Sequence, residues 1–498
     1  GGVGSGAGLW VGTPIGVLRA QWIGDGYEWR YFQGWLHLPS DSISALAPAG
    51  KGRMLAVATS GGLSVLAAEV WTLEKKAAHF QSLVAARHVR YGLVADCGFA
   101  KPADPSTFFH KDSDNDGLWT SMYAASQAFK YAVTKDSLAK HEALARFTAL
   151  KFLFDAAGAG WFNARSVARV GDKIYSGGHW ANSTTHPGWL FKRDTSSDEV
   201  TGHMFIYPIL YRLLDLNDTN KKEVVGLVDS LVGGILDHNL TLLDPVTHKH
   251  TLWGVWTPAY LDHTPEWADN RGIRALELLS YLASAEEMTG DAKYSAATKE
   301  MRTVHGFGRQ MVNTKITAPC DNNHSDDEET FLPLYSYLMA FKAMGRTPDA
   351  EFNATLHRLC RITQPERNAL YASICALGTG TQPPAGALAQ QLRGWPLDTT
   401  QYTWDNSRRV DVWRVSQGDL NQASAPFSED EQPLLRYNGN PYALFTGHPV
   451  SKGTNEVDPG AWLLSYWFNR YHGFLAGAAE QGVELRFGAH GSPVEPVA

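Results

Sequence analysis

Two segments of the chain combine carboxylates with a histidine where the pattern predicts the start of a helix. The first, SSDEVTGH, begins at Ser196, and the second, NHSDDEE, begins at Asn323. In each, a serine is followed three residues later by a glutamate (Ser196 to Glu199, Ser325 to Glu328), which is the spacing of a capping box before an apolar-periodic run. A cap needs only these two side chains, so the further acids and histidines have no structural role that the sequence reveals.

Acids at two helix starts in one helical domain predict the two sides of an active-site cleft. In glycosidases a pair of carboxylates divides into a proton donor and a base or nucleophile. Glu199 and His203 are four residues apart and therefore share one helical face. The alternative interpretation is that first-turn acids only offset the helix dipole. The candidate catalytic residues are Asp198, Glu199, His203, His324, Asp326, Asp327 and Glu328.

A polysaccharide lyase would use different groups on the same chain. It needs a histidine or tyrosine base and a cation that neutralises a uronate carboxylate. His203 or His324 and Tyr335 could supply the base, and Arg193 or Arg271 the cation. The sequence leaves hydrolase and lyase both open.

Tryptophans beside Asn, Asp and Arg in predicted loops point to carbohydrate binding. The chain has 17 Trp, 19 Tyr and 21 Phe, and aromatic faces stack on sugar rings. Any single Trp here is more often part of a core, but several beside polar residues favour sugar binding for the set. The candidate substrate-binding residues are Trp119, Trp189, Arg193, Trp253, Trp256, Arg271 and Trp404.

The segment DSDNDG, which ends at Gly117, matches the opening of a calcium loop. Asp112, Asp114 and Asp116 are spaced so that hard oxygen ligands can converge on one cation. The twelfth position is Tyr123, which excludes a full EF-hand, so the expectation is a looser, structural Ca²⁺ site. The same acids could instead face a sugar together with Trp119, or form a solvated turn. No P-loop or dinucleotide fingerprint is convincing, and no organic cofactor is expected.

A repeat occupies the first 75 residues. LWVGTPIGV begins at Leu9, and LAVATSGGL begins 46 positions later, at Leu55. Short alternating strands punctuated by glycine at such a period are typical of propeller blades. The strand "LWVGT..G" and the connector "LPSD.I", which begins at Leu38, resemble the two-component-regulator propeller repeat over residues 8–70. This part of the chain holds at most two blades.

The rest of the chain reads mainly as paired helices. Apolar periodicity predicts helices over 197–214, 221–238, 269–288, 291–311, 326–344, 350–363, 367–377 and 458–472. An (α/α) toroid fits this pattern better than an α-solenoid, because no fixed short period is present. The fold class is therefore mainly α, with partial propeller-like repeats (1–75), a toroid body (76–380), and a loop-rich segment with the closing helix (381–498).

With its helix pairs, acid clusters and aromatic loops, the body resembles the (α/α)-toroid carbohydrate-active enzymes over residues 100–475. This resemblance implies a glycoside hydrolase or polysaccharide lyase that binds glycans in the cleft of the toroid. It transfers no individual catalytic residue to this chain. A non-catalytic glycan-binding or assembly protein on the same fold is the third reading.

Composition limits where the protein works and what it binds. A net charge of -7 gives no support for nucleic-acid binding, and no apolar run is long enough to cross a membrane. The first residue is Gly1, so we expect a processed or truncated product.

The four cysteines lack metal-site spacing. Five Asn-x-Ser/Thr sequons favour a secreted or cell-surface protein (Asn182, Asn217, Asn239, Asn323 and Asn353). The oligomeric state is open.

Overall fold

The structure is a computed structural model in which α-helices dominate, as the periodicity predicts. It describes residues 9–23, 26–50, 54–315, 324–383, 386–402, 405–409, 411–415, 422–432, 436–444, 453–475 and 481–487. Within these residues there are fourteen α-helices and seven small sheets. Among the same residues we find no helix with the length and apolar content that a membrane crossing needs.

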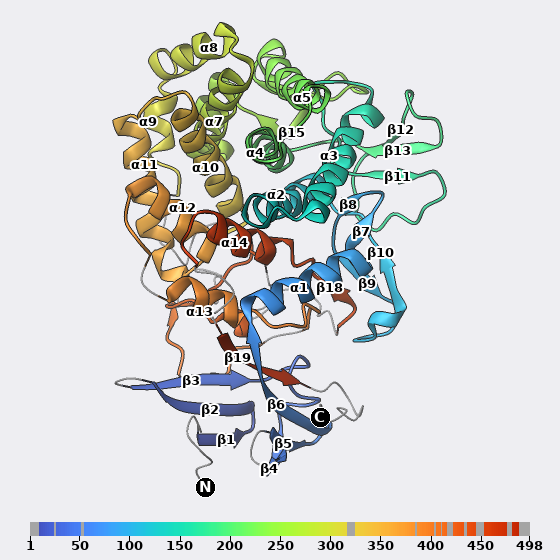
Figure 1. Ribbon diagram of the computed structural model, residues 1–498, viewed down its shortest axis with the longest axis vertical. Helices are drawn as coiled ribbons and strands as arrows, with labels where there is room; N and C mark the ends of the chain where they lie inside the picture. The colour runs from blue at the N-terminus through green and yellow to red at the C-terminus, as the bar shows by residue number, and fades with distance from the viewer. Residues whose placement is uncertain are drawn as a thin grey trace.

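Six helices are buried on nearly all sides, and we call them the inner helices. They are α2 (Asp116–Thr134), α4 (Ser197–Leu213), α7 (Arg271–Thr289), α10 (Asp327–Ala343), α12 (Ala369–Thr379) and α14 (Gly460–Tyr471). Each packs against the next in this order, and α14 packs against α2 (Figure 1). Their side chains are buried on almost every side, which is typical of helices inside a large core.

Six further helices have one buried and one solvent-exposed face, and we call them the outer helices. They are α1 (Leu73–Leu83), α3 (Ser137–Ala157), α5 (Asp218–Asp237), α8 (Ala292–Thr303), α11 (Ala350–Thr363) and α13 (Ala387–Gly394). Two short helices, α6 (Pro258–His263) and α9 (Phe307–Met311), lie in connections. The predicted helices are thus confirmed, except that the prediction of one helix over 291–311 is wrong: Gly306, with φ 70°, separates α8 from α9.

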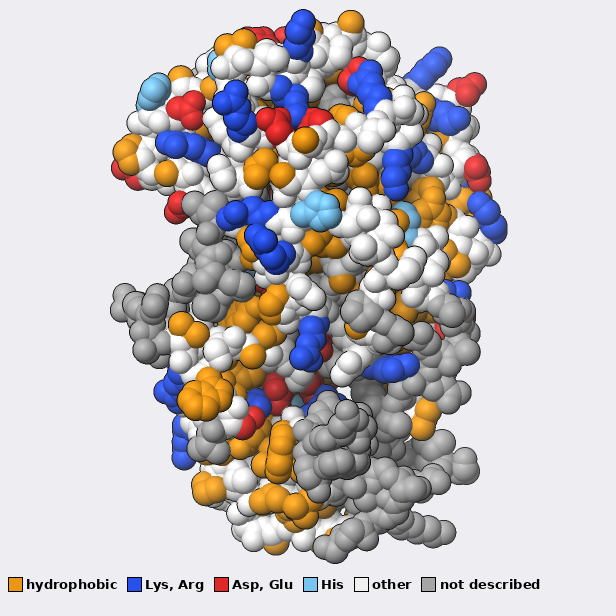
Figure 2. Space-filling view, turned by 90° about the vertical axis from the view of Figure 1, so that its left-hand side faces the viewer, with side chains coloured by type: hydrophobic (Ala, Val, Ile, Leu, Met, Phe, Trp, Pro, Cys, Tyr) orange, Lys and Arg blue, Asp and Glu red, His pale blue; other side chains and the backbone are white. Residues whose placement is uncertain are grey.

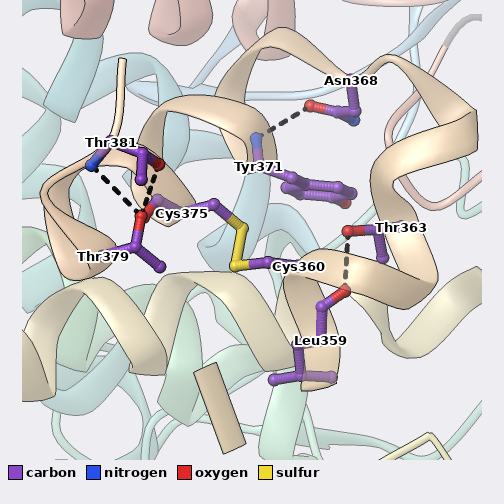
Figure 3. Close-up of a disulfide and its surroundings, with 8 residues drawn as sticks. All are labelled: Leu359, Cys360, Thr363, Asn368, Tyr371, Cys375, Thr379 and Thr381. Carbon is purple, nitrogen blue, oxygen red and sulfur yellow. Dashed lines mark hydrogen bonds between the residues drawn. A yellow bond between two sulfur atoms is a disulfide. The ribbon is translucent and has the colours of Figure 1, made fainter. Parts of the chain in front are cut away.

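A disulfide links α11 to α12. Cys360 and Cys375 are joined with their Cα atoms 5.7 Å apart (Figure 3). Closing a loop of this length stabilises the fold by about 3 kcal/mol through the unfolded state. Cys97 is buried and free, and Cys320 lies outside the described residues.

The N-terminal repeat forms two sheets beside the helical body (Figure 1). Strands β1 (Leu9–Thr13), β2 (Gly16–Ile23) and β3 (Gly26–Phe32) form one. The other has the order β19-β6-β5-β4, with β4 (Ile43–Ala49), β5 (Met54–Thr59), β6 (Gly62–Thr72) and β19 (Gln481–Phe487). All neighbours are antiparallel.

The two copies of the repeat fold alike. The β1–β2 turn is held by Thr13, whose hydroxyl donates to the Gly16 carbonyl at 2.8 Å, and the β5–β6 turn by Thr59, which donates to Gly62 at 2.9 Å. The sheets share a small core that includes Val17, Phe32 and Leu38. Figure 2 shows hydrophobic side chains gathering over the lower part of one face, where Figure 1 places these sheets. Trp29 of β3 is half exposed, at 50%.

The C-terminal segment returns to the N-terminal sheets, which the sequence did not suggest. Strand β19 pairs with β6, and the Tyr31 backbone N–H donates to Glu431 Oε1 at 2.9 Å. The Arg409 guanidinium lies 4.4 Å from the ring centre of Tyr31 and pairs with Glu431 at 3.0 Å. The loop-rich segment therefore bridges the sheets and the helical body.

The remaining strands are two to six residues long and lie in the connections between helices. They are β7 (Val89–Arg90), β8 (Leu93–Val94), β9 (Cys97–Phe99), β10 (Phe108–His110), β11 (Val167–Arg169), β12 (Trp180–Asn182), β13 (Trp189–Lys192), β14 (Thr241–Leu243), β15 (His250–Val255), β16 (Arg414–Val415), β17 (Gln422–Ala423) and β18 (Asn455–Glu456). A π-helical turn, η2 (Val84–His88), follows α1.

Candidate functional site

The starts of three inner helices meet at a cluster of buried acids. The Ser197 hydroxyl at the start of α4 donates to Glu329 Oε1 of α10 at 2.5 Å. Arg274 of α7 lies 3.6 Å from the same Glu329 oxygen and 2.9 Å from Glu277. The Trp256 indole N–H donates to Glu277 at 2.8 Å. The two acidic segments singled out in the sequence are therefore neighbours in space.

Glu328 is a buried acid of this cluster with a strongly raised pKa. Its side chain is 1% exposed, and neither carboxylate oxygen has a hydrogen-bond partner among the described residues. Burial raises the pKa of Glu328 to about 8. Arg436 opposes this increase, whereas the charges of Asp198, Asp458 and Asp327 add to it. Glu328 therefore holds its proton at neutral pH.

Asp198 is the acid whose charge acts on three of the others. It is half-buried and accepts a hydrogen bond from the Ser196 hydroxyl at 2.8 Å. Its charge contributes to the raised pKa of Glu277, Glu328 and Glu329, after the larger effect of burial. Asp198 thus lies near all three, and unlike them it reaches solvent.

The capping box predicted at Ser196 does not form. Ser196 is the N-cap residue of α4, but its side chain makes no capping hydrogen bond. Glu199 is fully buried and turns towards α2, where it accepts a hydrogen bond from the Leu118 backbone N–H at 3.2 Å. Burial raises the pKa of Glu199 well above its usual range. Gly117 leaves the space for this carboxylate, because a Cβ there would collide with Glu199 Oε2.

The second predicted capping box is also wrong. A 3₁₀ turn, His324–Asp326, precedes α10, which begins at Asp327 with Asp326 as the N-cap residue. Glu328 is therefore one position too early to close a box. Asp326 is half-buried at the edge of the cluster, and its backbone carbonyl accepts from the Thr330 hydroxyl at 2.8 Å.

His324 and Asp327 belong to a second group beside Glu328. The Nδ1 atom of His324 lies 3.0 Å from Asp327 Oδ2 and 3.7 Å from Glu366 Oε1. Lys315 pairs with Asp327. Burial, together with the charge of Asp327, raises the pKa of Glu366 to about 9.

His203 lies deeper, almost two turns into α4. It is fully buried, its Nδ1 atom is 2.7 Å from the Tyr207 hydroxyl, and its Nε2 atom has no hydrogen-bond partner in the described part of the chain. Burial lowers the pKa of His203 to about 3, so the imidazole is neutral. The Phe154 ring packs edge-on against it, with centroids 5.1 Å apart.

Arg436 is a site residue that sequence reasoning missed. Its guanidinium lies 3.9 Å from the ring centre of Trp119 and pairs with Asp96 and, at 2.8 Å, with Asp458. It comes from the segment expected to be loop-rich, where no periodicity marks it. Trp119 is 8% exposed beneath this arginine.

The three acids of the predicted calcium loop have separate protein partners. Asp112 accepts from the backbone N–H groups of Tyr175, at 2.7 Å, and Ser176. Asp114 pairs with Lys192. Asp116 is buried and pairs with Arg90 at 2.9 Å, and the hydroxyls of Ser113 and Ser166 also donate to it. The carboxylates of Asp112, Asp114 and Asp116 are not among the groups of the described residues that are close enough to hold one ion.

The remaining predicted substrate-binding residues lie at different depths. Trp253 on β15 is 43% exposed and packs on Trp267, with ring centroids 5.4 Å apart, whereas Trp256 is fully buried. The half-buried Trp189 lies under the Arg169 guanidinium, 4.0 Å from its ring centre. Trp404 lies outside the described residues.

Both arginines predicted to bind a uronate already interact with other groups of the protein. Arg193 pairs with Asp244 at 3.1 Å. Arg271 donates to the backbone carbonyls of Leu261, at 2.6 Å, and Asp262.

Two groups of described side chains are close enough together to hold a metal ion. One is His324 with Asp327 and Glu366, into which Lys315 already projects. The other consists of His88, Cys97 and Glu456, which come from η2, β9 and β18.

Comparison with known protein families and with curated proteins finds no family model that matches this chain and no significant curated relative.

Proposed function

We propose that the chain is an extracellular carbohydrate-active enzyme that hydrolyses a polysaccharide, with Glu328 as proton donor and Asp198 as base or nucleophile. The observation that carries the proposal is the pairing of two unlike acids. Glu328 is buried and protonated at neutral pH, and the half-buried Asp198 is close enough for its charge to act on Glu328. Acids whose environments differ in this way divide into a donor and a base.

The proposed architecture is an (α/α) toroid. It is supported by the order in which the inner helices pack, since α2, α4, α7, α10, α12 and α14 follow one another and α14 returns to α2. The outer helices alternate with them along the chain. In such an arrangement the starts of α4, α7 and α10 open towards the same end, where a glycan would bind. The two N-terminal hairpins support a propeller-like origin for residues 9–72.

In the proposed reaction, Glu328 gives its proton to the glycosidic oxygen as the bond to the anomeric carbon breaks. Asp198 either forms a bond to that carbon or removes a proton from the attacking water. Ser196 orients Asp198 through its hydroxyl, and Ser197 and Arg274 hold Glu329 beside it. Hydrolysis needs no base stronger than a carboxylate.

The ion pairs of the site favour hydrolysis over elimination. A lyase must neutralise a uronate carboxylate, but the cations beside these acids in the described part of the chain are paired: Arg274 with Glu277, and Arg436 with Asp458. Lys315 pairs with Asp327. The acids outnumber these cations, which favours a neutral glycan over a uronate-rich one.

Two observations support an extracellular location. A disulfide joins Cys360 to Cys375, and disulfides persist in oxidising compartments. The four described sequon asparagines are all exposed (Asn182, Asn217, Asn239 and Asn353), so each is accessible to glycosylation. The fifth, Asn323, lies outside the described residues.

The test is incubation with neutral and uronate polysaccharides while reducing ends and ultraviolet absorbance are recorded together. We expect reducing ends without absorbance, and loss of turnover in Glu328→Gln and Asp198→Asn. The matched control is Asp218→Asn, a first-turn acid at the exposed start of the outer helix α5. Absorbing products would identify a lyase instead. Glycan binding without any product would identify a binding protein.

A further inference from the structure

We propose that His88, Cys97 and Glu456 form a buried structural site for Zn²⁺ or a similar borderline-soft divalent cation. Three separate parts of the chain bring them together. His88 ends the π-helical turn η2, Cys97 begins β9, and Glu456 ends β18, directly opposite Cys97 in the antiparallel pair. All three are buried, and their potential ligand atoms lie within 4.8 Å of one another.

The distances within the group fit a tetrahedral ion. Glu456 Oε2 lies 3.4 Å from His88 Nε2 and accepts a hydrogen bond from the Cys97 thiol, whose Sγ is 3.4 Å away. Zinc bonds of about 2.0–2.3 Å at tetrahedral angles place ligand atoms roughly 3.3–3.8 Å apart. Thiolate, imidazole and carboxylate together are a zinc-type ligand set rather than a calcium or magnesium one.

The hydrogen bond on the far side of His88 orients the ring for this role. Its Nδ1 atom is 2.9 Å from the backbone carbonyl of Ala95, so Nδ1 carries a proton and donates it there. In the neutral ring Nε2 then presents a lone pair, and it faces a carboxylate oxygen without a hydrogen bond of good geometry. Two lone pairs at this distance repel unless a cation lies between them. That cation is either a metal ion or a second proton on His88.

Arg87 holds the Glu456 carboxylate in place, because it donates to both oxygens of Glu456 at 2.7 Å. When an ion binds, Cys97 loses its proton to solvent. The thiolate and Glu456 then offer two negative charges to the divalent cation.

An ion here would fasten the segment that leads to the acidic cluster. Asp458 follows Glu456 by two residues and pairs with Arg436, whose charge acts on Glu328. β18 would thereby be fixed to η2 and β9 by coordination as well as by its two-residue pairing. The ion itself would take no part in the reaction, so its test does not depend on the proposed function.

The experiment loads the chelator-treated full chain with Co²⁺ alone and records its absorption spectrum. We expect one equivalent of Co²⁺ to give a thiolate-to-cobalt charge-transfer band with tetrahedral ligand-field bands, and Zn²⁺ to abolish both and raise Tm. Cys97→Ser should lose the charge-transfer band. The matched controls, Cys320→Ser and His324→Asn, should keep it, which excludes Cys320 and the His324 group as the source of the band.

A second measurement uses only the wild-type protein, so the proposal can be tested even if Cys97→Ser does not fold. X-ray absorption of the Zn²⁺-loaded wild-type protein should report one sulfur ligand and two or three nitrogen or oxygen ligands. A wild-type spectrum without a charge-transfer band, together with a Tm that Zn²⁺ does not change, would overturn the proposal. The bridge between His88 and Glu456 would then be a proton.

Discussion

The outer and inner helices begin in different ways. Five outer helices, α1, α3, α5, α8 and α11, have an N-cap side chain that accepts a hydrogen bond from their own first turn. Of the inner helices, α2, α4, α7, α10 and α14 have no such bond in the described structure, and only α12 is capped, by Asn368. Uncapped helix ends leave backbone N–H groups and a partial positive charge unsatisfied.

This difference indicates that acids at the outer helix starts stabilise the fold, whereas acids at the inner helix starts are placed for chemistry. Acids at outer helix starts satisfy the helix to which they belong, as Asp291 does for α8. Acids at inner helix starts face other helices instead: Glu199 reaches α2, and Glu329 reaches Ser197 and Arg274. Burial raises the pKa of both glutamates, which weakens the fold but leaves protons available for transfer.

The sharpest way to test this comparison is to neutralise one acid of each kind. Glu328→Gln should lower kcat by about 10²–10⁴, because the side chain can no longer donate a proton to the leaving group. Asp218→Asn at the start of α5 should leave kcat unchanged. The measurement is the initial rate of reducing-end release on the best substrate of the panel. Equal rates for Glu328→Gln and the wild type would remove the catalytic distinction between the two groups.

Most substitutions in a protein core lower the free energy of unfolding. The same Glu328→Gln variant should raise it. The pKa of Glu328 is about 8 in the folded state and near 4.5 when unfolded, so the native state binds more protons between these values. Stability from this group therefore falls as pH rises from about 4.5 to 8. The free energy of unfolding of Glu328→Gln should therefore exceed that of the wild type by roughly 2–5 kcal/mol at pH 8 and by little at pH 4.

Urea unfolding at several pH values measures this difference. Glu300→Gln on the exposed side of α8 controls for the loss of one negative charge. A constant difference between Glu328→Gln and the wild type from pH 4 to 8 would contradict the perturbed pKa.

Helix positions could be predicted from the sequence because apolar periodicity is a local property. The predicted helix at 197–214 is α4 at Ser197–Leu213, and the one at 350–363 is α11 with identical bounds. The repeat at Leu9 and Leu55 likewise predicted short strands in two similar copies, and in the structure each copy closes its turn with its own threonine. The toroid and the propeller remain interpretations of the order of these elements.

The roles of individual acids could not be predicted because they depend on partners far along the chain. A serine three residues before a glutamate is the same pattern in a capping box and in α4, where Glu199 instead binds the N–H of Leu118, 81 residues away. The spacing of Asp112, Asp114 and Asp116 gives no sign of Lys192 and Arg90, which come from other elements to pair with two of them. The Ca²⁺ site expected there stays a prediction. Arg436 had no local signal at all.

Gly117 tests how tightly α2 and α4 are fitted together at the site. Gly117→Ala should destabilise the fold by about 1–3 kcal/mol, since its Cβ would collide with Glu199 Oε2. An unperturbed helix position would instead gain from the higher helix propensity of alanine. Gly226→Ala in α5, where a Cβ meets nothing within 4 Å, is the matched control and should be neutral or stabilising. Urea unfolding of both variants gives the comparison.

The smallest expected effect distinguishes Asp291, whose side chain caps α8, from Ser196, which occupies the N-cap position of α4 without capping it. Asp291→Ala removes the acceptor for the Lys293 backbone N–H, at 2.8 Å, and should cost about 1 kcal/mol of stability with kcat unchanged. Ser196→Ala removes no cap, because the Ser196 hydroxyl binds Asp198, and it should lower kcat by freeing that carboxylate. Unfolding free energies and initial rates of both variants decide the matter. If Ser196→Ala behaved like Asp291→Ala in both measurements, the start of α4 would be an ordinary helix end, and the difference between inner and outer helices would not extend to function.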